Sequence, residues 1–161
     1  MHRLTGALLG LMVAVAATSF AQTTPADSVF EAHRTRFDPA RDPSADVQTA
    51  TVTAVREKKR ILLDVGGEWC IWCHRLDRFL HDQSDLDAYL KDHFVVVKVN
   101  YSKENKNEKF LGQYPAIDGF PHVFLLEPDG KFLLSQSTGD FEAGKGYDHD
   151  KILQFLKKWT L

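Results

Sequence analysis

Two nearly continuous apolar runs, residues 61–65 and 94–99, have the pattern of strands that are buried on both faces of a sheet. Two further apolar stretches, residues 122–126 and 131–135, flank an Asp-Gly turn signal. Strand-like runs joined through such a turn predict an antiparallel hairpin. The chain is therefore expected to contain four strands, of which the last two are paired as a hairpin.

Apolar residues at helical spacing predict five helices around these strands. The helices are expected over residues 45–57, from about residue 70, from residue 84, within residues 100–112, and over residues 148–159. A parallel strand–helix–strand unit followed by a hairpin gives a mixed sheet with helices on its faces. The predicted fold class is α/β, a three-layer α/β/α arrangement around a central mixed sheet of about four strands.

The first of these helices has the weakest pattern. Ser44 is expected to be its N-cap, and a centre rich in threonine lowers its helix propensity. Its predicted core-facing stripe consists of Val47, Ala50, Ala54 and Val55.

The N-terminal 21 residues have the features of a secretory signal peptide. Arg3 gives a positive start, residues 4–17 are apolar apart from Thr and Gly, and Ser19-Phe20-Ala21 suits a signal peptidase. The apolar run is shorter than the roughly 20 residues of a spanning helix; an uncleaved anchor is the alternative. We expect a signal peptide over residues 1–21, export to the periplasm, and one domain over residues 44–161. Between them, residues 22–43 are expected to form an extended polar leader that either wraps the domain or stays mobile.

Composition and charge narrow the function further. The 161 residues, 43% of them hydrophobic and 26% charged, allow one domain of ordinary size, expected to be a monomer. A net charge of −2 gives no basic surface for nucleic acid. The only two cysteines, Cys70 and Cys73, are too close in sequence for a disulfide between them to remove much unfolded-chain entropy. The pair therefore predicts chemistry rather than a structural framework.

The position of the two cysteines assigns each a role. Cys70 lies where a buried strand gives way to a helix, and free N–H groups at a helix N-terminus favour a thiolate. Cys73 follows one turn later on the same face, where it can attack a mixed disulfide. The sequence therefore predicts a redox-active disulfide with Cys70 as the nucleophile and Cys73 as the more buried, resolving thiol.

Residues 61–64 together with Glu68-Trp69-Cys70-x-x-Cys73 resemble the active-site strand and helix of the thioredoxin superfamily. The run Trp-Cys-x-Trp-Cys-His is similar to exported bacterial members, and Gly119-Phe120-Pro121 resembles the family's loop with a cis proline facing the dithiol. The resemblance extends in element order from about residue 45 to the C-terminus, and the leader holds no clear counterpart of the first thioredoxin strand.

This resemblance implies a thiol–disulfide oxidoreductase that needs no bound cofactor, with reduction as the favoured direction. Its partners would be disulfides or dithiols of other exported proteins and an upstream membrane electron donor. Asp64, among apolar neighbours, would be desolvated and hard to ionise, and would relay the proton of Cys73 with Lys98 as its cationic partner. Strand alternation alone leaves open a solvated edge position for Asp64 and a surface position for Lys98.

Other residues next to the dithiol or the proline loop are expected to support the site. Trp69 would shield the dithiol, Trp72 would tune its redox potential, and His122 could contact it and titrate near neutral pH. Ordinary packing for Trp69, a trans bond at Pro121 and a loop histidine without a role are the alternatives. The supporting set is Trp69, Trp72, His74, Phe120, Pro121 and His122.

Three other functions fit parts of the same motif. Cys70-Ile71-Trp72-Cys73-His74 is also the c-type haem attachment pattern, with His74 as the proximal ligand. Both methionines, Met1 and Met12, lie in the predicted signal peptide, so the distal ligand would have to be a second histidine. A zinc site lacks a second Cys/His pair at defined spacing, and we expect no metal. A non-catalytic binding module would not need both cysteines beside Asp64.

Overall fold

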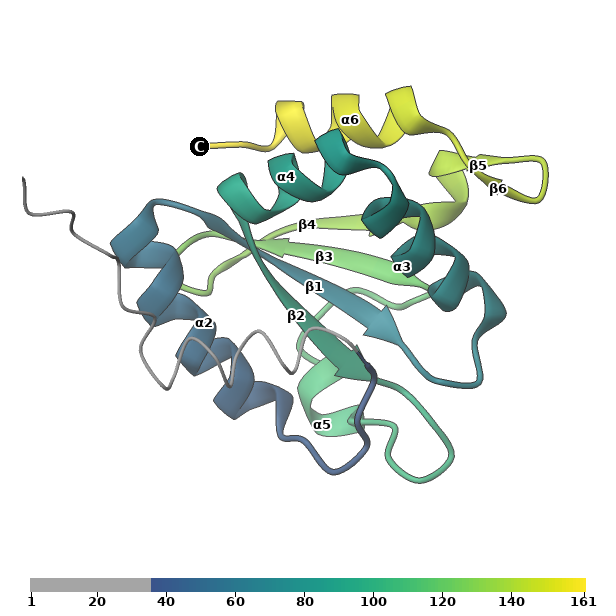
Figure 1. Cartoon of the computed structure of the whole chain (residues 1–161). Coiled ribbons are helices and arrows are strands. Elements are labelled where there is room, and N and C mark those ends of the chain that lie inside the picture. Colours follow the sequence, from purple (N-terminus) through teal and green to yellow (C-terminus); the bar gives the residue numbers. More distant parts are fainter. Residues whose placement is uncertain (1–35) are drawn as a thin grey trace, which may run out of the picture.

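The computed structural model describes residues 36–161 and shows a central sheet with helices on both faces (Figure 1). The sheet order is β2-β1-β3-β4. β1 pairs with β2 in parallel and with β3 antiparallel, and β3 pairs with β4 antiparallel. The strands are β1 (Arg60–Gly66), β2 (Phe94–Asn100), β3 (His122–Leu126) and β4 (Phe132–Ser137). The predicted α/β class with a mixed four-stranded sheet is confirmed.

Each face of the sheet has its own apolar core. One core joins the sheet to two helices, α2 (Pro43–Glu57) and α5 (Glu108–Leu111). The other joins it to α3 (Ile71–Asp82), α4 (Ser84–His93) and α6 (His149–Lys158). Because side chains alternate along a strand, Leu62 and Asp64 of β1 point to the second core, whereas Leu63 points to the first. Asp64, the predicted proton relay, thus lies on the face that α3 covers.

Helix α2 ends at Glu57 as predicted, but it differs from its predicted form at its N-terminus and in its core-facing stripe. Its N-cap is Asp42, whose carboxylate accepts a hydrogen bond from the Ser44 N–H at 2.9 Å, and the helix begins at Pro43 rather than residue 45. Proline suits the first helical position because its missing N–H would be unpaired there anyway. Ala50 and Ala54 face the sheet, whereas Val55 is 60% exposed. One residue beyond Ala54 the side-chain direction turns by about 100°, which carries Val55 into solvent.

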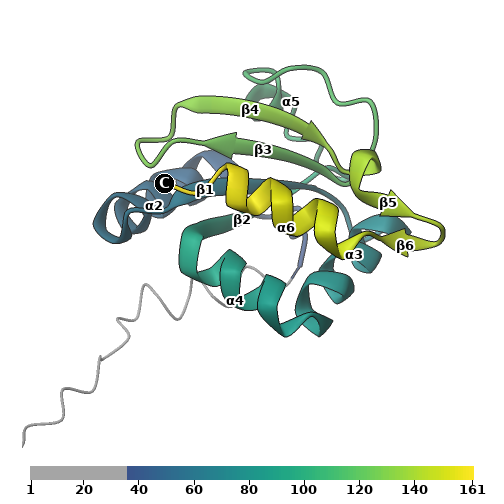
Figure 2. The same cartoon turned by 90° about the horizontal axis from the view of Figure 1, so that it is seen from above.

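A small hairpin between β4 and α6 was not predicted. After a 3-10 helix, η1 (Thr138–Phe141), the strands β5 (Glu142–Ala143) and β6 (Gly146–Tyr147) form a two-stranded sheet. Figure 2 shows it at the N-terminal end of α6, next to α3. Two-residue strands carry no periodicity that a sequence pattern could reveal.

The predicted signal peptide and residues 22–35 of the predicted leader lie outside the described residues. No helix within residues 36–161 is long and apolar enough to cross a membrane. The described end of the leader, residues 36–42, is packed onto the domain, with the Phe37 side chain 1% exposed. This described end of the segment therefore lies against the domain, as one of the two expected forms of the leader would.

Candidate active site

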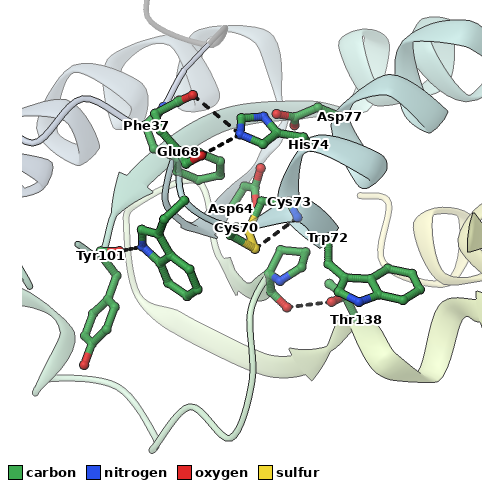
Figure 3. Close-up of a disulfide and its surroundings, with 12 residues drawn as sticks. Phe37, Asp64, Glu68, Cys70, Trp72, Cys73, His74, Asp77, Tyr101 and Thr138 are labelled. Atoms are coloured by element: carbon green, nitrogen blue, oxygen red, sulfur yellow. Dashed lines mark hydrogen bonds and ion pairs between the residues drawn. A yellow bond between two sulfur atoms is a disulfide. The ribbon is translucent and has the colours of Figure 1, made fainter. Parts of the chain in front are cut away.

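The cysteine pair lies between β1 and α3, just beyond the carboxyl end of this central strand (Figure 3). Cys70 is the N-cap of α3, and its Sγ accepts a hydrogen bond from the Cys73 N–H at 3.1 Å. The two sulfurs form a disulfide with the Cα atoms 5.2 Å apart. After reduction, the same N–H and the helix N-terminus can stabilise a thiolate on Cys70. Cys73, 1% exposed against 4% for Cys70, is the more buried of the pair.

A cluster of three charged groups lies behind the pair, of which Asp64 and Lys98 are buried and Asp77 is half-buried. The register of β1 and β2 sets Asp64 opposite Lys98, and the Lys98 Nζ lies 3.1 Å from the Asp64 Oδ2. The same Nζ donates to both oxygens of Asp77 on α3, at 2.5 and 2.6 Å. The other oxygen, Asp64 Oδ1, is buried with no hydrogen-bond partner among the described residues. Asp64 thus has one oxygen held by the ammonium and one that can accept a proton.

The cluster changes how two of its members titrate. Burial and the nearby Asp64 carboxylate raise the pKa of Asp77 from its usual 3.8 to about 6. For Lys98, burial works toward a lower pKa, but the carboxylates of Asp64 and Asp77 outweigh it and raise the pKa above 10.5. Lys98 is therefore a fixed cation at neutral pH, and Asp77 can change its charge near pH 6.

The sequence pattern does not single out Asp77 as a site residue. On an amphipathic helix a carboxylate normally marks the solvent face, and its partner Lys98 comes from a different element. The available signal was its spacing: Asp77 follows Cys73 by four residues, so both lie on the same side of α3.

Phe37 and Glu68 also belong to the site although the pattern did not single them out. The Phe37 ring packs against Cys70 and Cys73, and its backbone N–H donates to the Glu68 Oε1 at 2.7 Å. Gly66 lies under them: a Cβ there would meet the Cys73 Sγ at 2.5 Å. The sulfur therefore needs glycine at this position. A phenylalanine between polar neighbours, such as Phe37 between Arg36 and Asp38, gives no periodic signal.

The rim around the disulfide is aromatic and apolar. Trp69 is 58% exposed; its indole N–H donates to the Tyr101 carbonyl oxygen at 2.6 Å, and the ring meets the edge of Phe120. Phe120 stacks on Tyr101, with ring centroids 4.7 Å apart. Ile71, between the cysteines, is 60% exposed. Exposed apolar side chains next to a reactive pair suit contact with another polypeptide.

Trp72, the second residue between the cysteines, is held from the side of the small hairpin. Its ring meets Tyr147 edge-on at 5.7 Å, and the Arg75 guanidinium lies 4.6 Å from the ring centre. The Tyr147 hydroxyl donates to the Trp72 carbonyl oxygen at 3.2 Å. Trp72 is thus fixed by the hairpin and by its own helix.

The proline loop has the predicted backbone form, since the Phe120–Pro121 bond is cis. The Pro121 carbonyl oxygen accepts a hydrogen bond from the Thr138 hydroxyl at 2.5 Å, which joins the loop to η1. His122 follows, but its Nε2 lies 2.8 Å from the Ser135 Oγ and its ring packs on Phe124. Burial lowers the pKa of His122, so the ring is neutral at pH 7 and occupies a structural position in the sheet.

His74 is tied to the loop that precedes it. Its Nε2 lies 2.8 Å from the Glu68 carbonyl oxygen and 3.7 Å from the Glu68 carboxylate. The haem interpretation needs this nitrogen on iron and both sulfurs in thioethers, whereas here the sulfurs are bonded to each other. Within residues 36–161, no three His, Cys, Asp or Glu side chains are grouped to hold a metal ion.

A cavity of about 360 Å³ separates the charged cluster from α4 and α6. Asp64, Asp77 and Lys98 belong to its lining, together with apolar side chains such as Leu62. Exposed His81 lines it too, so the cavity connects the cluster with the surface.

Comparison with known proteins agrees with this geometry. A family model described as thioredoxin-like matches residues 42–128. The disulfide bond reductase DsbH of Chlamydia pneumoniae is 27% identical over 105 residues, which cover 60% of this chain and 61% of that protein. The thiol:disulfide interchange protein DsbD of Pseudomonas fluorescens is 26% identical over 125 residues, 77% of this chain but 20% of its own length.

Among solved structures, the disulphide isomerase from Xylella fastidiosa Temecula1 aligns with a TM-score of 0.62 and 29% identity. The alignment covers 76% of this chain and 94% of that one. The matched parts span less than two thirds of the length of DsbH and of DsbD. The chain belongs to the thioredoxin-like family and carries the CxxC pair of its thiol–disulfide oxidoreductases.

Proposed function

We propose that this protein is an exported, periplasmic oxidoreductase that reduces disulfides in other exported proteins through Cys70 and Cys73. The observation that carries the proposal is the disulfide at the N-terminus of α3, with the Cys73 N–H on the Cys70 Sγ. The reducing direction is supported by the similar Chlamydia protein, which is a disulfide bond reductase by name. In this proposal the signal peptide of residues 1–21 is removed, and residues 44–161 form the catalytic domain.

The reduced protein would act in two exchange steps. The Cys70 thiolate attacks one sulfur of the substrate disulfide, a Cys70–substrate bond forms, and the other substrate sulfur leaves as a thiolate. Cys73 then gives its proton to Asp64 Oδ1, and its thiolate attacks the Cys70 Sγ. The second substrate sulfur leaves as a thiolate, and the enzyme is left as the disulfide. A dithiol donor, proposed to be a membrane protein, must supply two electrons to restore the reduced pair.

Insulin reduction tests the proposed activity. With dithiothreitol as the electron donor, the protein is expected to speed precipitation of the insulin B chain, and equilibration of the pair with glutathione buffers gives its potential. A potential more reducing than that of its exported substrates is expected of a donor of electrons. A protein that neither reduces insulin nor oxidises a dithiol peptide at any glutathione ratio would be a binding module with this fold.

Replacing Asp64 with asparagine tests the proton step. Asp64→Asn should slow release of the reduced substrate by roughly 10²-fold, the lower range of general base catalysis, and leave the first attack nearly unchanged. Stopped-flow tryptophan fluorescence can separate the two steps, since Trp69 and Trp72 flank the cysteines. Asp82→Asn, the same substitution at an exposed aspartate that ends α3, is the matched control. Equal slowing of both steps would show that Asp64 only maintains the structure.

A further inference from the structure

Phe37 occupies an unusual position for a residue at the end of a polar segment. It precedes the region matched by the family model, residues 42–128, and yet its side chain is 1% exposed. Its neighbours are the two cysteines rather than either of the large apolar cores. The segment before α2 thus supplies one wall of the reactive centre.

The Phe37 ring contacts both the resolving sulfur and the charged cluster. A Cβ built on Gly66 would lie 2.5 Å from the Cys73 Sγ and 3.0 Å from the Phe37 Cζ, so ring and sulfur pack on the same glycine. On its other side, the ring centre lies 4.1 Å from the Lys98 Nζ. An ammonium at this distance from an aromatic face is attracted to it. The ring therefore covers Cys73 and Lys98 together.

The backbone around Phe37 is held at several points. The Phe37 N–H donates to Glu68, in the loop that carries Cys70, and the Asn105 side chain donates to the Pro39 carbonyl oxygen at 2.9 Å. The Asp38 carboxylate accepts from the Ala40 N–H at 2.9 Å, which fixes the turn between them. Two of these bonds come from the loops that carry Glu68 and Asn105, and the third lies within the segment itself. Together they fix the position of the Phe37 ring.

We propose that Phe37 is a positioning residue that seals the inner side of the dithiol. It excludes water and small reagents from the Cys73 sulfur, so that partner proteins meet Cys70 alone. This inference rests on the proposed function for its purpose, but the seal itself can be measured without any substrate.

Alkylation of single-cysteine variants measures the seal directly. In a Cys70→Ser background, iodoacetamide can react only with Cys73, and mass spectrometry of the intact protein follows the reaction. Phe37→Ala is expected to raise this rate by about tenfold or more, because reaction follows thiolate character and access. In a Cys73→Ser background the same change should alter the rate at Cys70 less than about twofold.

Three further variants separate sealing from loss of stability. Phe37→Leu keeps an apolar plug and is expected to preserve most of the protection of Cys73. Glu68→Ala leaves the Phe37 ring but removes the carboxylate that holds the Phe37 backbone. It should give a smaller increase in the alkylation rate of Cys73 than Phe37→Ala does. If Phe37→Ala does not fold, Glu68→Ala takes its place in the test. Phe94→Leu makes the same Phe-to-Leu change at another buried ring, which is 2% exposed at the start of β2. It should leave Cys73 protected from alkylation.

The outcomes are distinct from those of the insulin assay. A tenfold rise at Cys73 in Phe37→Ala, without a rise in Phe94→Leu, supports the seal even if the protein does not reduce insulin. Unchanged alkylation of Cys73 in folded Phe37→Ala, or an equal increase in Phe94→Leu, overturns it even if insulin is reduced. Urea unfolding of each variant identifies those that are folded under the labelling conditions.

Discussion

Cys73→Ser is expected to leave the protein covalently joined to its substrates, whereas Cys70→Ser should lower disulfide exchange by on the order of a thousandfold or more. Without Cys73, no second sulfur lies next to Cys70 to release the mixed disulfide formed in the first step. Without Cys70, the sulfur at the helix N-terminus is lost and the remaining one is buried under Phe37. Gels run without reductant, followed by mass spectrometry of the shifted bands, detect the adduct.

Serine is a matched replacement at both positions. A serine at residue 70 can cap α3 as cysteine does, because its hydroxyl accepts the hydrogen bond from the N–H of residue 73. Both variants should therefore fold, which urea unfolding can verify in the presence of reductant. An adduct that forms with Cys70→Ser and not with Cys73→Ser would reverse the roles of the two sulfurs. No adduct with either would contradict the exchange mechanism.

The order of the large elements could be predicted because each one buries an apolar pattern longer than a turn. The runs 61–65 and 94–99 can be covered on both sides only inside a sheet, and the Asp-Gly pair forces a turn before residue 131. The helix start at Pro43 was missed by two residues because Asp42 and Ser44 are both good caps, and only the backbone path decides between them.

The parts of the site that could be predicted are those that follow one another along the chain. Cys70 and Cys73 belong to one loop and helix, and their chemistry follows from that position. Phe37 and Asp77 reach the site through long-range contacts, with the disulfide and with Lys98 respectively. No local pattern encodes such a contact, because either residue would look the same on a surface.

Lys98 links these two parts of the site, and its removal is expected to cost more stability than any other change to the charged cluster. Lys98→Met should lower the free energy of unfolding by roughly 3–5 kcal/mol at pH 7, the usual result of leaving buried charge without its partner. The Lys98 side chain is 4% exposed, and its one ammonium binds the carboxylates of both Asp64 and Asp77. Methionine keeps most of the side-chain volume, so the loss reports on charge rather than on a cavity. Urea unfolding measures it.

The loss of stability in Lys98→Met should depend on pH, and the raised pKa of Asp77 determines the direction of that dependence. In the native protein that pKa is raised from 3.8 to about 6, so the stability contributed by protonated Asp77 is complete below pH 3.8 and disappears as the pH rises through 6. The Lys98 ammonium lowers the pKa of Asp77 and so opposes the effect of burial. Without Lys98 the carboxyl keeps its proton to higher pH, and the difference between variant and wild type should grow from pH 5 to pH 8.

The control is Lys91→Met on α4, which breaks an exposed ion pair with Asp87, one helical turn away. The Lys91 side chain is 50% exposed, and such pairs contribute less than about 1 kcal/mol. If Lys98→Met lowered the free energy of unfolding by no more than about 1 kcal/mol, and equally at pH 5 and pH 8, then Asp64 and Asp77 would not depend on a shared cation. A large loss that grows with pH would instead mean that the same ammonium holds α3 to β1 and sets the charge beside Cys73.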